Sequence, residues 1–191
     1  MVTKRMNLEE LEKIDSKKMY QTYDKWPEIA KDGFDNDFEK FDAKGIDHIV
    51  FSGMGGSGSI GDVISAILSK EDIHVSNVKG YHLPKTVDSN TLVISTSVSG
   101  NTKETLTVLE KAQKTDAKIA VFSSGGMIQK FSKTNNLFFQ EISMIHSPRA
   151  SFPKFLFAIL NILKEIIPIK KTHVEEAISS LEITRNNIFS N

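Results

Sequence analysis

The sequence contains no cysteine and no excess of either charge, and each absence narrows the possible functions. Without cysteine there can be no disulfide and no thiolate chemistry, which favours a reducing, cytoplasmic setting. The 24 Lys and Arg residues balance the 24 Asp and Glu residues, whereas proteins that bind a nucleic-acid backbone usually carry a basic excess. We therefore expect no nucleic-acid partner.

Long apolar runs are also missing. The most apolar segment, 155–167, contains Lys164 and Glu165 and is shorter than the roughly 20 residues that a membrane span needs. Residues 1–15 are polar and lack the apolar stretch of a signal peptide. We expect no membrane partner and interpret 155–167 as a buried helix. A chain of 191 residues that is 39% hydrophobic is long enough for one domain with a core.

Short β-rich segments alternate with amphipathic helical segments after residue 45. The expected strands cover 48–52, 73–78, 91–95, 118–122 and 137–142. This alternation predicts an α/β fold with a parallel sheet that helices cover on both faces. The simplest arrangement is a doubly wound, three-layer sandwich with a five-stranded parallel sheet in the order 2-1-3-4-5.

The chain divides into three expected parts. Residues 1–45 form a helical arm, residues 46–168 the α/β domain, and residues 169–191 a C-terminal helix. The last helix carries an apolar stripe that includes Val174, Leu181 and Ile188. This stripe could belong to a linker toward a second domain, form a dimer contact, or pack back onto its own domain.

Glycine is scarce, with 11 residues, and eight of them lie in three clusters. The clusters are Gly53, Gly55, Gly56, Gly58 and Gly61, then Gly100, then Gly125 and Gly126. The first has the spacing G-x-G-x-x-G between a strand and a helix, which suggests a dinucleotide site. However, the second strand ends at Val78-Lys79-Gly80 without the acidic residue that would hold a ribose. A purely structural tight turn also explains these glycines.

The loop after the third strand, residues 95–102, contains five hydroxyl side chains. Hydroxyls and unpaired N–H groups at a helix N-terminus can hold a phosphate dianion without Lys or Arg. Asn101 and Glu104 have the spacing of a capping pair, so we expect the helix to begin there. A plain Ser/Thr-rich cap and turn is the alternative. Ser123–Gly126 leave the next strand at the same edge, which suggests a small phosphorylated ligand.

Together these motifs resemble the sugar-isomerase (SIS) domain and are most similar to the first half of the bifunctional phosphoglucose/phosphomannose isomerases. The similar segments are GMGGSG at 53–58, YHLP at 81–84, STSVSGNTKETL at 95–106, FSSGG at 122–126 and SPRASFP at 147–153. The resemblance implies that Ser97, Ser99 and Thr102 hold a sugar phosphate and that Gly55, Gly56 and Ser57 lie along the sugar. Val98 departs from the pattern because an aromatic residue often follows the first serine.

The resemblance also implies a reaction, in which glucose 6-phosphate or mannose 6-phosphate interconverts with fructose 6-phosphate through a cis-enediol. Arg149 would stabilise the enediolate as a catalytic residue, although a surface ion pair is its plainer interpretation. In this family the catalytic Glu and ring-opening His lie in the second half or come across a dimer, so the catalytic set looks incomplete here. His146 lies three residues before Arg149, but a lone histidine is more often structural.

We therefore expect a phosphorylated hexose as ligand and a homodimer or a second SIS domain as partner, with no cofactor and no metal. The alternative function is a non-catalytic module that binds a sugar phosphate as a sensor or scaffold.

Overall fold

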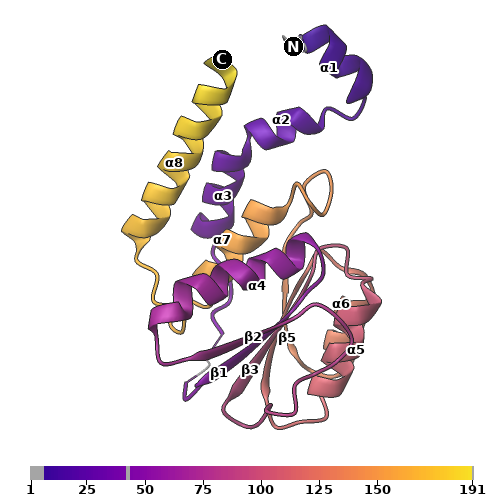
Figure 1. Cartoon of the computed structure of the whole chain (residues 1–191). Coiled ribbons are helices and arrows are strands. Elements are labelled where there is room, and N and C mark those ends of the chain that lie inside the picture. The colour runs from indigo at the N-terminus through magenta and orange to yellow at the C-terminus, as the bar shows by residue number, and fades with distance from the viewer. Residues whose placement is uncertain (1–6, 42–43, 191) are drawn as a thin grey trace, which may run out of the picture.

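The computed structural model describes residues 7–41 and 44–190, and its centre is a five-stranded sheet in the predicted order β2-β1-β3-β4-β5 (Figure 1). The strands are β1 (His48–Ser52), β2 (His74–Val78), β3 (Thr91–Ser97), β4 (Lys118–Ser123) and β5 (Phe138–Glu141). All neighbouring strands are parallel, so every strand ends at the same edge of the sheet.

The central strands β1 and β3 are buried along their whole length, which explains their nearly continuous apolar sequences. Because successive side chains point to opposite faces, each strand contributes to two separate cores. One core contains Phe51, Ile94 and Phe122, and the other contains Val50, Val93 and Val121.

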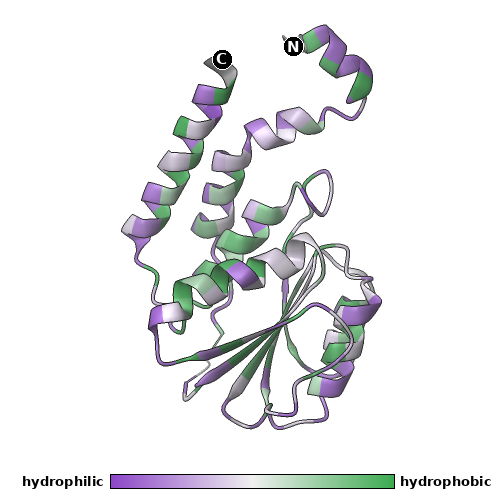
Figure 2. Ribbon diagram, in the orientation of Figure 1, coloured by the Kyte–Doolittle hydropathy of each residue, from purple (hydrophilic) through white to green (hydrophobic). Residues whose placement is uncertain are grey.

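Helices cover both faces of the sheet, as the alternating pattern predicts. On one face lie α4 (Gly56–Ile67), which continues into the short 3-10 helix η1 (Leu68–Lys70), and α7 (Phe152–Ile162). On the other face lie α5 (Lys103–Ala112) and α6 (Gly126–Thr134) (Figure 1). Figure 2 shows that α7 is hydrophobic over most of its length, which agrees with its burial between the sheet and the helical arm.

The N-terminal arm consists of three helices, α1 (Leu8–Ile14), α2 (Met19–Asp24) and α3 (Trp26–Asp35). Only α3 lies closely on the domain, against α7. At Gly33 an added Cβ would be 2.7 Å from the carbonyl oxygen of Lys154, so this crossing needs a glycine. The indole Nε1 of Trp26 donates to the carbonyl oxygen of Ala150 at 3.0 Å, which ties α3 to the loop before α7.

The C-terminal helix α8 (Lys171–Ser190) runs beside α3 (Figure 1). Val174 of its apolar stripe is buried, and Leu181 is half-buried against the same core cluster, whereas Ile188 is 71% exposed. The first part of the stripe thus packs onto its own domain. No helix in the described part of the chain is long and apolar enough to cross a membrane.

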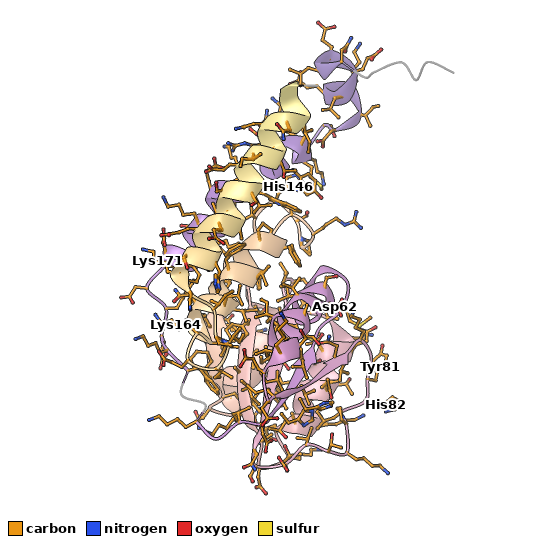
Figure 3. The ribbon with its side chains drawn as sticks, turned by 60° about the vertical axis from the view of Figure 1, so that its left-hand side comes forward. Asp62, Tyr81, His82, His146, Lys164 and Lys171 are labelled. Carbon is orange, nitrogen blue, oxygen red and sulfur yellow. The ribbon has the colours of Figure 1, made fainter. Side chains whose placement is uncertain are left out.

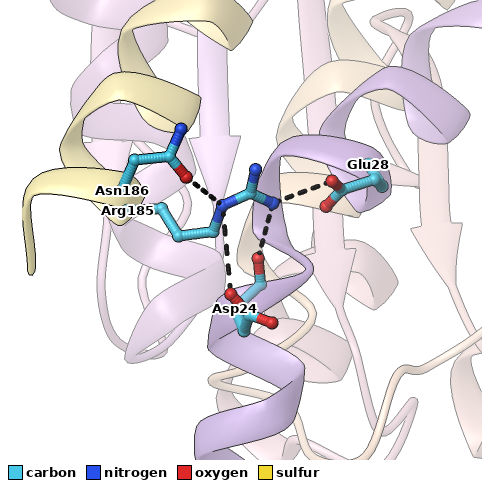
Figure 4. A network of polar contacts seen from close by, with 4 residues as sticks. All are labelled: Asp24, Glu28, Arg185 and Asn186. Carbon is cyan, nitrogen blue, oxygen red and sulfur yellow. Dashed lines mark hydrogen bonds and ion pairs between the residues drawn. The ribbon is translucent and has the colours of Figure 1, made fainter. Parts of the chain in front are cut away.

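Arg185 joins α8 to the junction between α2 and α3 (Figure 4). Its guanidinium donates to a carboxylate oxygen of Glu28 at 2.8 Å and to the backbone carbonyl of Asp24 at 3.1 Å. The bond from Arg185 lowers the pKa of Glu28 below its ordinary value. One side chain of α8 therefore fastens two helices of the arm.

Candidate functional site

Three helices begin at the edge where the strands end, and none of them has a side-chain cap. The loops after β1, β3 and β4 lead directly into α4, α5 and α6, and the N-cap residues are Gly55, Thr102 and Gly125. Side-chain caps are also missing from α2, α3 and α7, whereas α1 at the far end of the arm has a full capping box between Asn7 and Glu10. The positive ends of three helix dipoles therefore gather at one edge, which we call the carboxyl rim, although two first-turn N–H groups of α6, those of Met127 and Ile128, already donate to Asn101 and Gly100.

The loop after β3 is held by its own hydroxyl groups. The buried Ser97 hydroxyl lies 2.9 Å from the hydroxyl of Thr102 and accepts a hydrogen bond from the N–H of Gly100 at 3.1 Å. Ser99 is exposed, and its hydroxyl accepts from the N–H of Asn101 at 3.4 Å. The structure thus brings Ser97 and Thr102 together and leaves Ser99 facing solvent beside them.

The predicted cap at Asn101 is wrong. The N-cap of α5 is Thr102, and the side-chain oxygen of Asn101 instead accepts from the N–H of Met127 in α6 at 3.2 Å. Its amide nitrogen donates to the carbonyl oxygen of Ser99 at 3.0 Å. Asn101 therefore links two loops rather than ending one helix.

The loops after β3 and β4 cross at glycines. Gly100 has a φ of 70°, and an added Cβ would lie 1.7 Å from the carbonyl oxygen of Gly125. The N–H of Ile128 donates to the carbonyl oxygen of Gly100 at 3.0 Å, and the N–H of Ser124 donates to that of Val98 at 3.2 Å. No other residue type can occupy position 100 without moving the second loop.

The loop after β1 leaves open space at two of its predicted binding residues. Gly55 and Gly56 are exposed, and a Cβ added to either would have no atom within 4 Å. Ser57, in the first turn of α4, is 7% exposed, and its hydroxyl makes no hydrogen bond within the described residues. These positions have the room for a ligand to approach the backbone at the start of α4.

Several buried hydroxyls beneath the rim lack a hydrogen-bond partner, and sequence reasoning included two of them, Ser95 and Thr96, only as members of the loop after the third strand. Among the described residues, they are Ser52, Ser95, Thr96 and Thr105. Ser52 and Ser95 are register partners on β1 and β3, and Thr105 lies in the first turn of α5. Serine and threonine at the ends of buried apolar strands were a readable signal, because such positions usually carry aliphatic side chains.

Arg149 lies in the loop between β5 and α7 and is exposed, and its guanidinium makes no ion pair or hydrogen bond with any described residue. The surface ion pair, which was the plainer interpretation of Arg149, is therefore not formed within the described part of the chain. No hydrogen bond or ion pair joins Arg149 to the rim residues either. His146 turns instead toward the arm, where its Nε2 lies 3.0 Å from the carbonyl oxygen of Lys17.

Two glutamates lie near the rim, and both are engaged. Glu104, in the first turn of α5, forms a hydrogen bond with the phenol of Tyr81 that raises the tyrosine pKa above its ordinary value. Glu141 ends β5, and its carboxylate accepts from Gln129 of α6 at 3.1 Å. The described residues contain no group of three or more His, Cys, Asp or Glu side chains arranged to hold a metal.

Residues 44–143 match the family model of the SIS domain. The chain belongs to the SIS domain family. The match covers the sheet from β1 to β5, including all three loops of the carboxyl rim.

Relatives of this SIS domain include bifunctional phosphoglucose/phosphomannose isomerases. The chain is 34% identical to the one from Thermoplasma acidophilum over 143 residues, which is 73% of this chain and 43% of the relative. It is 36% identical to that of Aquifex aeolicus over 160 residues, 79% of this chain and 50% of the relative. The chain thus spans half or less of the length of these relatives.

A solved structure supports the fold. The tagatose-6-phosphate ketose/aldose isomerase from Escherichia coli superposes with a TM-score of 0.62 at 18% identity, over 85% of this chain and 52% of that one. At this identity the likeness concerns the fold alone.

Proposed function

We propose that this SIS domain binds the phosphate of a hexose 6-phosphate at the carboxyl rim, as part of an isomerase that interconverts glucose 6-phosphate or mannose 6-phosphate with fructose 6-phosphate. The observation that carries the proposal is the meeting of three helix N-termini at one edge, where the first turn of α5 has no side-chain cap. A phosphate dianion is stabilised by such N–H groups and helix dipoles. The names of the curated relatives supply the substrate class.

In this proposal the loop after β3 holds the phosphate through Ser97, Ser99 and Thr102. The hydroxyls of Ser97 and Thr102 are 2.9 Å apart, so either one can turn its proton toward an anion while the other keeps the contact between them. Gly55, Gly56 and Ser57 line the sugar, where the open space at the start of α4 supports their assignment.

The isomerisation transfers a proton between C1 and C2 through a cis-enediol. Arg149 would stabilise the enediolate oxygen, because its planar cation is fully charged and has no partner within the described residues. The base and the ring-opening acid would come from a second SIS domain or a second copy of this chain.

Binding can be tested with a double variant, Ser99→Ala with Thr102→Val, by calorimetric titration with fructose 6-phosphate. The dissociation constant should rise by about tenfold or more, because hydrogen bonds to a charged group contribute roughly 1.5–3 kcal/mol each. The matched control is Ser69→Ala with Thr107→Val, whose hydroxyls bond only to helix carbonyl groups. Equal affinities of the two variants would place the phosphate elsewhere.

Turnover is tested by following glucose 6-phosphate formation from fructose 6-phosphate. The chain alone should bind the sugar phosphate and convert little of it, and addition of a protein that supplies the second SIS domain should restore conversion. Binding without conversion in both mixtures would favour the non-catalytic module.

A further inference from the structure

We propose that a hollow between the helical arm and the loop after β5 binds a small phosphorylated anion, as a second site separate from the carboxyl rim. The hollow has a volume of about 500 Å³, which is within the usual range for small-molecule sites. None of its lining residues belongs to the rim loops. This inference goes beyond the proposed function and does not depend on it.

Positive charge concentrates in this hollow. Lys17, Lys18 and Lys25 line it together with His146, and no carboxylate does. None of the three lysines forms an ion pair within the described residues. Asp15 and Glu28 interact with His146 and Lys25 and reduce the positive field, but neither carboxylate lines the hollow, so the lysines are the charges that a bound anion would meet first. One exposed lysine would contribute little, but three around one hollow act on the same ligand.

The backbone on both walls of the hollow adopts a conformation that side chains disfavour. Lys18 has a φ of 53° and His146 a φ of 55°, and these are two of the three non-glycine residues with positive φ in the described chain. Such conformations cost energy and often occur at functional sites. Here they turn the two walls toward each other, so that the Nε2 of His146 reaches the carbonyl oxygen of Lys17 at 3.0 Å.

The contact with Lys17 also determines which ring nitrogen of His146 is left available to a ligand. A carbonyl oxygen only accepts, so Nε2 must carry a proton, and Nδ1 makes no hydrogen bond within the described residues. Asp15 is close enough to interact with His146, but its carboxylate already accepts from the N–H of Tyr20 at 2.9 Å. The apolar side chains of Ile29 and Ile145 complete the lining and would contact an uncharged part of the ligand.

The position of the hollow connects it to the proposed catalytic arginine. His146 precedes Arg149 by three residues in the same loop. Figure 3 shows His146 beside the arm and well apart from Tyr81 and His82, which follow β2. An anion held by Lys17 and Lys25 of the arm and in contact with His146 would fasten the arm to the loop that carries Arg149.

Pyrophosphate serves as the probe, titrated calorimetrically into the full chain at low ionic strength. The charge-removing variant is Lys17→Gln with Lys25→Gln. Its matched control is Lys164→Gln with Lys170→Gln, two exposed lysines that do not line the hollow. The rim variant Ser99→Ala with Thr102→Val separates the two sites. Glucose 6-phosphate and fructose 6-phosphate, titrated in parallel, distinguish a phosphosugar from a free phosphate anion.

Pyrophosphate should bind the rim variant and the Lys164/Lys170 control, and the Lys17/Lys25 variant should bind at least tenfold more weakly. Hydrogen exchange of the amides at 143–150 should also slow when pyrophosphate binds the rim variant. The proposal is overturned if the two lysine variants lose affinity equally, because that result indicates diffuse surface charge. It is also overturned if the rim variant no longer binds pyrophosphate.

Discussion

The polar groups at the two ends of the sheet differ in kind and in how they are hydrogen-bonded. The carboxyl rim is built from glycines, hydroxyls and helix N-termini, whereas the amino end of β1, β2 and β3 holds histidines and a carboxylate. His48 is 6% exposed, and its Nε2 lies 3.1 Å from the hydroxyl of Ser76, which also lies 3.2 Å from the Nε2 of His74. One end thus leaves donors available, and the other end pairs its polar atoms with one another.

The hydrogen bonds at the amino end involve Thr91 and His48. The hydroxyl of Thr91 donates to the carboxylate of Asp88 at 3.0 Å, and its oxygen accepts from the N–H of Asp88 at 3.0 Å and lies 3.4 Å from the Nδ1 of His48. When Nδ1 carries the proton, the neutral His48 ring accepts from Ser76 at Nε2. A second proton on His48 would remove Nε2 as an acceptor for Ser76.

The largest effect should come from breaking the rim at Gly100. Gly100→Ala combines a backbone φ of 70° with a clash against Gly125, so we expect a loss of about 3–4 kcal/mol in unfolding free energy. Urea denaturation measures it. Gly45→Ala is the control, since its φ of 77° is also unfavourable but its Cβ would meet no atom within 4 Å, and it should cost only about 1–2 kcal/mol. Equal losses would mean that the crossing of the two loops is not tight.

A pair of serine variants should sharpen the comparison. Ser76→Ala leaves the buried His48 without its Nε2 partner and should lower the unfolding free energy by about 1–3 kcal/mol without changing fructose 6-phosphate affinity. Ser97→Ala should cost only about 1 kcal/mol, because the N–H of Gly100 keeps the Ser97 carbonyl as acceptor, but should weaken ligand binding. Urea denaturation and calorimetric titration of both variants test this prediction. It is contradicted if Ser76→Ala weakens fructose 6-phosphate binding or if Ser97→Ala leaves that binding unchanged.

The smallest effect is the pH dependence of stability. Burial, and then the neighbouring His74, lower the pKa of His48, while a hydrogen bond to the backbone of Thr86 and then the charges of Asp88 and Asp47 oppose this in part. The unfolded chain therefore binds more protons, so stability should fall as the pH drops below about 6.5, by at most about 1.4 kcal/mol per pH unit. His48→Gln should remove this slope in urea denaturation between pH 7 and pH 5. His82→Gln, an exposed imidazole, should keep it.

Much of the fold could be predicted because the central strands and their helices carry local patterns. The run of buried residues in β1 requires a sheet covered on both faces, and parallel strands with helical crossovers leave few possible strand orders. The end of β3 was predicted two residues early. Thr96 and Ser97 continue the ladder opposite Phe122 and Ser123, and polarity alone suggested a loop.

The parts that could not be predicted depend on contacts between distant segments. The composition of the loop after β3 indicated an anion site, but not that Asn101 would bond to α6 instead of capping α5. Likewise, the apolar periodicity of a helix predicts that one of its faces is buried, but it does not identify the segment that covers this face. Only the fold shows that Trp26 reaches Ala150 and that His146 reaches Lys17.

The crossing of the loops after β3 and β4 has a consequence for motion. Because the carbonyl of Gly100 accepts from α6 and that of Val98 accepts from Ser124, neither loop can open without releasing the other. We therefore expect the first turns of α5 and α6 to open together, with one common rate of local unfolding. A ligand held at one of these helices would slow the fluctuations of both.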